Sequence, residues 1–371
     1  MIRPRGSESS VKYTWHNTMN QEIRQPDRCR TLVIGVGGAG CNTVTRVMEM
    51  GDTGIECVAI NTDAVHLRAC KASQKILIGE RLTRGFGVGG DPKLGRAAIE
   101  ESRAVVEDLL LGVDIVFLTA GLGGGTGTGA APVVAEIARR KGAVVVGVVT
   151  MPFRIEKGRM KYAASALAEM RRQCDTVVVI DNNKLMHLAP QLPLGEAFRV
   201  ADQVLARMID GIVETISAPS LINLDFADFK TIVRRGGMAI VGVGESDAPN
   251  RAEEAVRNAL RSPLLDVDYA GATGALIHVT GDSQMTIEEA NRVGEIVTEM
   301  MDNDALVIWG ARVNPELTGK LKVTLVMTGV ESSDVPEELG TIAPQLFNME
   351  PRSGLERHLG IELNLYQLEN P

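Results

Sequence analysis

Apolar and polar residues alternate along the chain so as to predict strands and helices in turn from Thr31 to about residue 181. Short apolar runs rich in β-branched residues begin at residues 31, 56, 75, 114, 143 and 176. The stretches between them, at 40–50, 92–111, 129–141 and 159–173, are long enough for crossover helices. Near-continuous apolar strands that alternate with helices are typical of a parallel sheet covered on both faces, so we predict an α/β fold.

A long amphipathic helix is predicted next, at Glu196–Ser217. It ends before Ala218-Pro219, because the residue before a proline disfavours the helical conformation. Beyond it, apolar runs starting at 238, 275, 305 and 320 and helical segments near 250–261 and 286–301 predict a smaller α+β domain. The apolar stripe of the long helix repeats at steps of three or four residues and comprises Ala201, Leu205, Met208, Ile212 and Ile216.

These patterns divide the chain into four parts. Residues 1–30 form a polar N-terminal extension, 31–218 a first domain that includes the central helix 196–217, 219–330 the α+β domain, and 331–371 a polar tail. Within the tail, residues 361–368 alternate apolar and polar side chains. This segment could add as an edge strand to its own domain or dock on a partner.

Charge and composition exclude several classes of protein. The 371 residues carry 39 basic and 47 acidic side chains, and the formal net charge of −8 argues against nucleic acid as a main partner. The longest apolar stretch, residues 143–153, is far shorter than the roughly 20 residues of a membrane helix. The N-terminus has no signal-peptide core, so we expect a cytoplasmic protein without direct membrane insertion. The five cysteines form no CxxC pair and predict no metal site.

The first glycine-rich loop, Gly35–Gly40, follows a predicted strand and opens a helix. Backbone N–H groups and the positive end of a helix can hold a phosphate at such a place. The loop also matches GxGxxG, but the next strand ends in Asn61, where a dinucleotide-binding fold would carry an acidic residue. For this loop alone, a dinucleotide, another phosphate ligand and a tight structural turn all stay open.

A second glycine loop, residues 121–129, favours a phosphate ligand because it presents another ring of amides between a strand and a helix. Neither loop contains lysine and the chain has no GxxxxGK[ST] motif, which excludes a P-loop enzyme. Phosphate charge would be met by amide dipoles, by the hydroxyls of Thr126 and Thr128, and by Mg²⁺. A third glycine-rich turn, residues 85–92, would either close over a γ-phosphate or form a mobile surface loop.

Five motifs together carry a resemblance to a known family. They are GGGTGTG at 123–129, NTDA at 61–64, LTRGFGVGGDP at 82–92, MPF at 151–153 and NLDFADF at 223–229. From about Thr31 to Val330 the sequence resembles the tubulin-like cell-division GTPase FtsZ in its archaeal form. The resemblance implies a parallel-sheet GTPase domain joined by the central helix to a smaller α+β activation domain. It also implies GTP or GDP as the ligand, with Mg²⁺.

The resemblance implies which residues bind the phosphates and the sugar. Asn61 and Asp63 would lie near the phosphates and Mg²⁺. Pro152, Glu156 and Arg159 would lie near the sugar and phosphate, although Glu156 and Arg159 are three residues apart here, one fewer than in the family pattern. The remaining residues on this side are Gly37, Gly38, Ala39, Gly40, Asn42, Gly89, Gly90, Gly123, Gly124, Gly125, Thr126, Gly127, Thr128 and Gly129.

The resemblance also implies how the base is held. Asn182 and Asp202 match the residues that contact the guanine edge, and Phe198 matches the ring that packs on the base. Guanine offers N1–H and the N2 amino group on one edge, and a carboxylate accepts from both, whereas adenine has no such pair. Without the resemblance, Asp202 would be interpreted as a solvated helix position and Phe198 as a core aromatic.

Asn223, Asp225 and Asp228 follow the far end of the central helix. The 22 residues of that helix, at about 1.5 Å each, separate its ends by about 33 Å, so these side chains cannot easily reach their own nucleotide. An ordinary interpretation makes the two acids a helix N-cap and a surface charge. The resemblance implies instead that they orient a water for attack on the γ-phosphate of the next subunit. Such a heterologous contact generates filaments, so hydrolysis would depend on assembly.

The predicted function is that of a GTPase that assembles head to tail at the cell-division ring, on the inner face of the membrane. Its partners would be further copies of itself and division-site adaptor proteins, the latter bound through the tail. The tail does not match the DIPxFL-like segment by which bacterial FtsZ binds membrane adaptors. The alternatives are a tubulin-like filament for cell shape or DNA positioning and, less favoured, a dinucleotide-dependent oxidoreductase.

Overall fold

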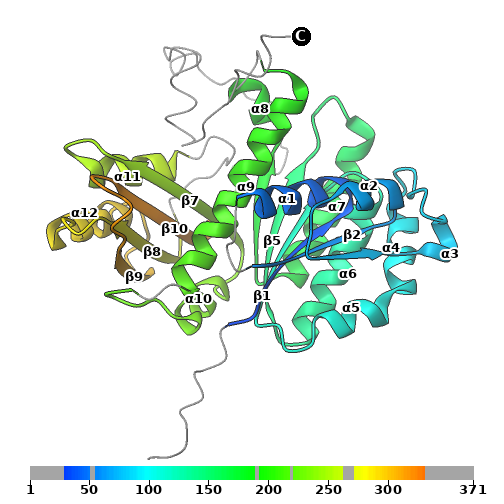
Figure 1. Ribbon diagram of the computed structural model, residues 1–371, viewed down its shortest axis with the longest axis horizontal. Helices are drawn as coiled ribbons and strands as arrows, with labels where there is room; N and C mark the ends of the chain where they lie inside the picture. Colours follow the sequence, from blue (N-terminus) through cyan, green and yellow to red (C-terminus); the bar gives the residue numbers. More distant parts are fainter. Residues whose placement is uncertain (1–28, 51–54, 189–191, 218–219, 262–270, 331–371) are drawn as a thin grey trace, which may run out of the picture.

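The computed structural model describes residues 29–50, 55–188, 192–217, 220–261 and 271–330 (Figure 1). The predictions for the chain before Cys29, for the helix stop at Ala218-Pro219 and for the tail 331–371 with its alternating segment fall outside these residues. Arg30, assigned above to the extension, belongs to the fold, because its backbone oxygen accepts a hydrogen bond from Ile115 N at 3.2 Å.

Parallel strands form the first half of the sheet, as predicted. Their order is β3-β2-β1-β4-β5-β6, so the direction in which the sheet grows reverses between β1 and β4. In open α/β sheets such a reversal leaves a crevice at the carboxyl ends of the two strands, where ligands bind. The strands are β1 (Thr31–Val36), β2 (Glu56–Asn61), β3 (Gln74–Leu77), β4 (Ile115–Gly121), β5 (Val144–Met151) and β6 (Thr176–Asp181).

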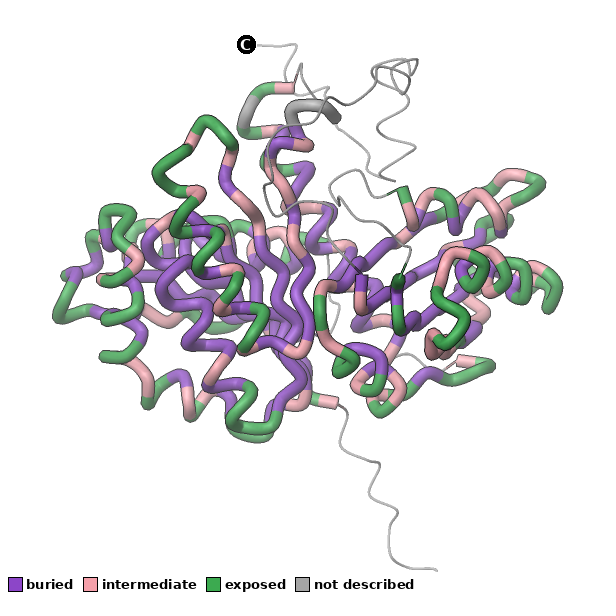
Figure 2. Tube along the Cα trace, turned by 180° about the vertical axis from the view of Figure 1, so that it is seen from behind, coloured by how far each residue is buried: buried purple, intermediate pink, exposed green. Residues whose placement is uncertain are grey.

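Helices cover both faces of these strands, whose side chains point alternately to the two sides and are apolar on both. Val33 and Phe117 pack toward α1 and α9, whereas Leu32 and Leu118 pack toward α4, α5, α6 and α7. Figure 2 shows the buried strands enclosed by helices whose outer surfaces are exposed. The helices are α1 (Gly37–Glu49), α2 (Ala64–Ala69), α3 (Glu80–Thr83), α4 (Pro92–Glu101), α5 (Arg103–Leu109), α6 (Thr126–Arg140), α7 (Lys157–Gln173), α8 (Asn183–Leu188) and α9 (Leu194–Ser217).

Two helices differ from the prediction. The stretch 92–111 is divided into α4 and α5, because the chain leaves the helical conformation at Ser102, whose hydroxyl accepts a hydrogen bond from Gly79 N at 3.2 Å. The central helix α9 begins at Leu194 and not at Glu196, directly after Pro193. Its predicted apolar stripe is buried from Ala201 to Ile212, with Ile216 partly exposed, and the helix stands between the two halves of the molecule (Figure 1).

The second half of the sheet is mixed. Its strands are β7 (Met238–Ser246), β8 (Gly274–Gly281), β9 (Leu306–Val313) and β10 (Leu321–Val330), in the order β7-β10-β8-β9, and β10 is antiparallel to both its neighbours. The helices are α10 (Phe226–Val233), α11 (Arg251–Leu260) and α12 (Ile287–Thr298). A pairing of Val177 with Met238 joins β6 to β7, so the first and second predicted domains share one continuous sheet. Within the described ranges, no helix has both the length and the apolar character to cross a bilayer.

Candidate nucleotide site

Three glycine segments meet where the order of the sheet reverses. Gly37, at the start of α1, lies against α6, since a Cβ on Gly37 would stand 2.9 Å from Gly127 N. The third turn packs on the second loop, since a Cβ on Gly125 would stand 2.9 Å from Asp91 N. We call these three segments, residues 35–40, 85–92 and 121–129, the cradle.

Two helices begin in the cradle without a capping side chain. Neither α1 nor α6 has a side-chain cap or an acidic residue in its first turn. The first amides of a helix have no partner within it, and its N-terminus carries a positive partial charge. Two such ends in contact can hold an anion such as a phosphate. The exposed residues around them are Gly38, Ala39, Asn42, Gly89 and Gly90.

Close approach explains why glycine recurs in the cradle. A Cβ on Gly40 would stand 2.4 Å from Thr119 O, and one on Gly127 would stand 2.6 Å from Gly121 O, distances that real Cβ atoms do not show. Gly123 has a φ of +95°, in the left-handed region that favours glycine. A Cβ on Gly124 would meet nothing within 4 Å, so this residue faces open space.

The two threonines of the second loop hold its shape. Thr128 Oγ1 accepts a hydrogen bond from Gly123 N at 2.8 Å, and Thr126 Oγ1 lies 2.7 Å from Thr62 Oγ1. Both threonines are buried. Their hydroxyls therefore have structural partners, to which the predicted phosphate contacts would be added.

The end of β2 brings a carboxylate and an imidazole to the cradle. Asn61 is buried, and its Oδ1 accepts hydrogen bonds from the two following backbone amides, while its Nδ2 lies 3.3 Å from His66 Nδ1. Asp63 caps α2 through Oδ1, which accepts from Val65 N at 2.9 Å and His66 N at 3.0 Å. The Oδ2 atom of Asp63 takes part in neither of these two hydrogen bonds.

Pro152, Glu156 and Arg159 meet at the second glycine loop. A Cβ on Gly123 would stand 3.1 Å from Pro152 Cγ and 3.0 Å from Arg159 Cβ. Glu156 Oε2 pairs with Arg159 Nη1, and Glu156 Oε1 accepts a hydrogen bond from Phe153 N at 3.2 Å. Glu156 is the N-cap residue of α7 and Arg159 lies in its first turn, so the shortened motif still places the two charges together.

α9 carries the predicted base contacts over α1. Asp202 Oδ1 accepts a hydrogen bond from Thr43 Oγ1 at 3.1 Å, so it is not a solvated position. Phe198, one turn earlier, is 38% exposed and packs edge-on against Phe153 with ring centroids 5.8 Å apart, so it is not a core aromatic. Burial raises the pKa of Asp202 to about 6, and the Thr43 hydroxyl opposes that shift.

Two asparagines follow β6, namely Asn182 and Asn183, the second of which begins α8. Asn183 is buried, accepts a hydrogen bond from Arg154 N at 2.8 Å and donates to Asp181 Oδ1. It therefore fastens the loop after β5 to the end of β6. Asn182, the predicted contact to the guanine edge, is half-buried beside it, and its role stays a prediction.

Known proteins match this chain over both halves. Residues 30–190 match the GTPase domain of the Tubulin/FtsZ family, and residues 237–331 match the C-terminal domain of the FtsZ family. Cell division protein FtsZ 2 of Methanocaldococcus jannaschii is 54% identical over 309 residues, which cover 82% of this chain and 81% of that protein. Cell division protein FtsZ 1 of Pyrococcus furiosus is 52% identical over 320 residues, 86% of each. The chain belongs to the FtsZ family.

Solved FtsZ and CetZ structures have the same fold. An empty FtsZ dimer of M. jannaschii gives a TM-score of 0.76 at 48% identity and covers 86% of this chain and 96% of its own. A GTPγS-bound protofilament of CetZ2 from Haloferax volcanii gives a TM-score of 0.71 at 26% identity, and the match covers 82% of this chain and 94% of the CetZ2 chain. The predicted tubulin-like fold and GTPase class are confirmed, and the oxidoreductase alternative is not favoured by any of these matches.

In this FtsZ chain the predicted hydrolytic residues lie in the segment that leads into α10 and in its first turn, where Asp225 is the N-cap and Asp228 the third helical residue. Asp225 Oδ1 accepts a hydrogen bond from Asp228 N at 2.9 Å, and Asp228 Oδ2 accepts one from Asp225 N at 3.1 Å. The two acids thus form a capping box, which confirms the N-cap interpretation and leaves one oxygen of each carboxylate for another partner. Asn223 and Asp225 are exposed and Asp228 is half-buried. We call residues 220–228 the acidic loop.

The acidic loop and the cradle lie at opposite ends of α9. Along α9 (Leu194–Ser217), Asp202 and Ser217 are separated by about 22 Å, at about 1.5 Å per residue. The cradle is at the carboxyl ends of β1 and β4, whereas α10 lies near the other end of α9 (Figure 1). The structure therefore brings the predicted nucleotide residues together and keeps the three acidic-loop residues apart from them.

Sequence reasoning missed four residues that adjoin the site. Thr43 lies one helical turn after the predicted residue Gly40, and His66 lies one turn after Asp63. This spacing is the signal in the sequence that could have indicated them. The other two are direct neighbours of predicted residues, namely Phe153 and Asn183.

Proposed function

We propose that this FtsZ chain hydrolyses GTP at the contact between two copies arranged head to tail. The cradle of one copy, with Asn182, Phe198 and Asp202, binds the nucleotide, and the acidic loop of the next copy completes the reaction site. The observation that supports this proposal is the separation of the two residue sets along α9. Neither set can perform the reaction with the other set of its own chain.

The cradle suits a triphosphate bound with Mg²⁺. No group of three or more His, Cys, Asp or Glu among the described residues could hold a metal by itself. Mg²⁺ is commonly held by one or two carboxylates together with substrate phosphates and waters, and Asp63 Oδ2 fits that pattern. In a cradle without lysine, Mg²⁺ would neutralise phosphate charge that the amides only partly offset.

Asp225 and Asp228 would act on the nucleophile. Phosphoryl transfer requires a water placed in line with the leaving group, and the protein contributes mainly positioning and charge. A carboxylate oxygen that accepts a hydrogen bond from this water orients it and can take its proton. The capping box fixes both carboxylates on one turn of backbone, which limits how far either can move.

Apolar side chains at both poles support a head-to-tail contact. Near the cradle, Phe86 is 87% and Val65 73% exposed, and in the acidic loop Leu221 is 75% exposed. A head-to-tail contact would remove these apolar groups from water, and different surfaces on the two partners would make the contact heterologous. The dimer of M. jannaschii FtsZ and the protofilament of CetZ2 are assemblies of related chains.

The proposal also covers the place of action. The curated relatives are cell division proteins, so we assign this chain to the cytoplasmic face of the division site. Adaptor proteins would attach it there through residues 331–371, which lie outside the described residues. Fluorescence localisation in dividing cells tests this point, and absence from the division site would favour the cell-shape or DNA-positioning alternative.

Mixing two inactive variants tests the shared site. Asp228→Asn keeps an oxygen to accept from Asp225 N, so it should fold and bind GTP normally while turnover falls by about 10²-fold or more. Gly125→Ala should lose nucleotide binding, because its Cβ would stand 2.4 Å from Val88 Cγ2. In an equimolar mixture about a quarter of head-to-tail contacts would pair an intact cradle with an intact acidic loop.

The mixture should therefore recover part of the wild-type turnover. Glu289→Gln is a matched control, because it alters the same position of the other capping box, at α12, and should leave turnover unchanged. No recovery in a mixture whose two variants sediment together would contradict the shared site.

A further inference from the structure

The acidic loop is fastened to the edge strand β9 by backbone hydrogen bonds. Leu221 N and Ile222 N donate to Ala311 O at 2.9 and 3.1 Å, and Ala311 N donates to Ile222 O at 3.1 Å. This isolated antiparallel bridge immediately precedes Asn223 in the chain. The register of the bridge therefore determines where the proposed hydrolytic residues begin.

Glycine at position 310 allows this contact. A Cβ on Gly310 would stand 2.6 Å from Leu224 Cγ and 2.7 Å from Ile222 O. Leu224 is 1% exposed and lies between Asn223 and Asp225, so its side chain anchors the middle of the acidic loop against β9. The backbone of Gly310 is not in the left-handed region, so space and not conformation requires glycine here.

Arg312, two residues after Gly310 on β9, pairs with Glu214 of α9. Glu214 Oε1 accepts a hydrogen bond from Arg312 Nη1 at 2.9 Å, and Glu214 Oε2 accepts one from Lys322 Nζ of β10 at 2.8 Å. Burial alone would raise the pKa of Glu214, but Lys322 and Arg312 outweigh it and hold the pKa below its ordinary value. The ionised carboxylate thus joins α9, β9 and β10 one turn before α9 ends.

His278 of β8 adds a second connection at the same place. It is buried, and its Nδ1 lies 3.3 Å from Thr215 Oγ1 at the end of α9. Its Nε2 lies 3.4 Å from Ser220 Oγ at the start of the acidic loop. Figure 1 shows α10, β8 and β9 gathered near this end of α9. The end of α9 and the start of the acidic loop are therefore both held by neighbouring strands of the sheet, β8 and β9.

We propose that Gly310 and Arg312 of β9, with Glu214 of α9, are positioning residues for GTP hydrolysis. They hold the acidic loop at the place where its carboxylates meet the γ-phosphate bound by the neighbouring copy. The inference rests on the proposed shared site and adds to it residues that touch neither nucleotide nor water. Displacing a reacting group by about 1 Å can cost about 10²-fold in rate, so a shift of the loop lowers kcat while nucleotide affinity is kept.

Gly310→Ala is the main test, with Gly294→Ala in α12 as its control, because a Cβ on Gly294 would meet nothing within 4 Å. Gly310→Ala should bind GTP with unchanged Kd and lower kcat by about 10- to 100-fold. Gly294→Ala should leave both unchanged. The ion pair of Arg312 with Glu214 is tested in the same way. Arg312→Ala should lower kcat, whereas Arg312→Lys, which can still pair with Glu214, should retain most of it.

Mixing experiments separate this inference from the shared site itself. Gly310→Ala should regain turnover with Gly125→Ala, as Asp228→Asn does, and should not regain it with Asp228→Asn, because both then lack a working acidic loop. If Asp228→Asn complements Gly125→Ala while Gly310→Ala alone is fully active, the positioning role is wrong and the shared site stands. If Asp228→Asn fails to complement Gly125→Ala although the two variants sediment together, the shared site is wrong.

Two further outcomes would overturn the positioning role. One is a loss of turnover in Gly310→Ala that Gly125→Ala does not restore, which would place the damage outside the acidic loop. The other concerns folding: if Gly310→Ala does not fold, Arg312→Ala and Glu214→Gln enter the same mixtures, and full activity of both variants would contradict the role.

Discussion

At the scale of single residues, the proposed contact of Asp202 with guanine predicts that nucleotide binding depends on pH. Burial raises its pKa to about 6, and guanine needs the ionised carboxylate as an acceptor. The affinity of the nucleotide-free protein for GDP should therefore be nearly constant above about pH 7 and fall by up to about tenfold per unit below pH 6. Titration of a fluorescent GDP analogue between pH 5 and 8, in roughly half-unit steps, measures this. The phosphates of GDP can also take up protons in this pH range, and Asp202→Asn is the control for that effect. If GDP affinity falls with pH as steeply in Asp202→Asn as in the wild type, the role of Asp202 is refuted.

Ionisation of the same side chain is expected to lower the stability of the folded protein, although it favours nucleotide binding. Because the folded pKa of about 6 lies above the ordinary 3.8, the folded state holds the proton more tightly than the unfolded state. The stability that Asp202 contributes is complete below about pH 4 and is lost as the pH rises through about 6, by at most about 3 kcal/mol. Asp202→Asn should thus raise the free energy of unfolding at neutral pH while it weakens GDP binding. Denaturant titrations without nucleotide at about pH 5 and pH 7.5 measure it, and an Asn variant less stable at both would contradict the argument.

Single residues also show where sequence reasoning about the site stops. The glycine motifs located the cradle because, where backbone segments approach this closely, only glycine has room, since it carries no Cβ. The hydrogen bond from Thr43 to Asp202 joins positions 159 residues apart, and no local pattern records such a pair. For the same reason the contact of Phe153 with Phe198, and the bridge from Ile222 to Ala311, became visible only in the fold.

At the scale of elements, α4 lies so close to α6 that glycine is required at the crossing. A Cβ on Gly129 would stand 2.1 Å from Pro92 O, and one on Gly95 would stand 2.4 Å from Gly125 O. Gly129→Ala should push the helices apart, lower the free energy of unfolding by about 2–3 kcal/mol and weaken nucleotide binding through the start of α6. Denaturant unfolding and GDP titration measure both. Gly158→Ala in α7, where a Cβ meets nothing within 4 Å, is the control and should not destabilise.

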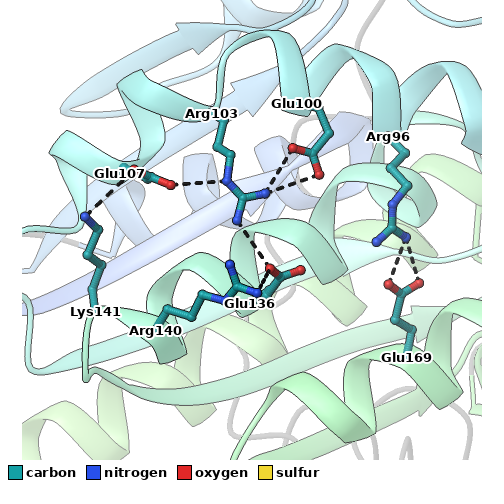
Figure 3. Close-up of polar contacts among 8 residues, drawn as sticks. All are labelled: Arg96, Glu100, Arg103, Glu107, Glu136, Arg140, Lys141 and Glu169. Atoms are coloured by element: carbon teal, nitrogen blue, oxygen red, sulfur yellow. Dashed lines mark hydrogen bonds and ion pairs between the residues drawn. The ribbon is translucent and has the colours of Figure 1, made fainter.

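Ion pairs connect the helices on the same face of the sheet (Figure 3). Arg103 of α5 pairs with Glu100, Glu107 and Glu136, and its side chain is 25% exposed. Partly exposed pairs contribute about 1 kcal/mol or less each, and salt weakens them. Arg103→Met should therefore lower Tm by roughly 2–4 °C at low salt and by less at about 1 M salt. Arg68→Met, an exposed arginine outside this network, is the comparison, and equal shifts in both variants would contradict the network's role.

Elements also differ in how well a pattern predicts them. The strands from β1 to β10 were located because each is a nearly continuous apolar run, and α9 because its stripe persists over many turns. The short helices α2, α3 and α8 were not predicted, and α10 was implied only by the N-cap interpretation of the two acids, since four to eight residues are too few to show a helical period. The continuity of the sheet through Val177 and Met238 was not predicted either, because strand register is decided by tertiary packing.

At the scale of the whole molecule, the proposed shared site would make turnover a property of contacts between copies. In this proposal α9 both carries the base contacts Phe198 and Asp202 and keeps the acidic loop away from the cradle of its own chain. In a filament built in this way, each contact would join the acidic loop of one copy to the cradle of the next, so that every internal copy would both receive and supply a reaction site. Turnover per subunit should accordingly rise with concentration until assembly is complete.

Mixtures with excess inactive subunits distinguish this arrangement from a site within one chain. With a tenfold excess of Asp228→Asn, each wild-type acidic loop still meets an intact cradle, so turnover per wild-type subunit should be unchanged. With the same excess of the double variant Asp228→Asn/Gly125→Ala, only about one in ten of the wild-type acidic loops meets a wild-type cradle, and turnover per wild-type subunit should fall by about tenfold. Phosphate release and sedimentation, measured on the same samples, give turnover and coassembly together. A site complete within one chain predicts no difference between the two mixtures, because neither variant would then alter the reaction in a wild-type neighbour.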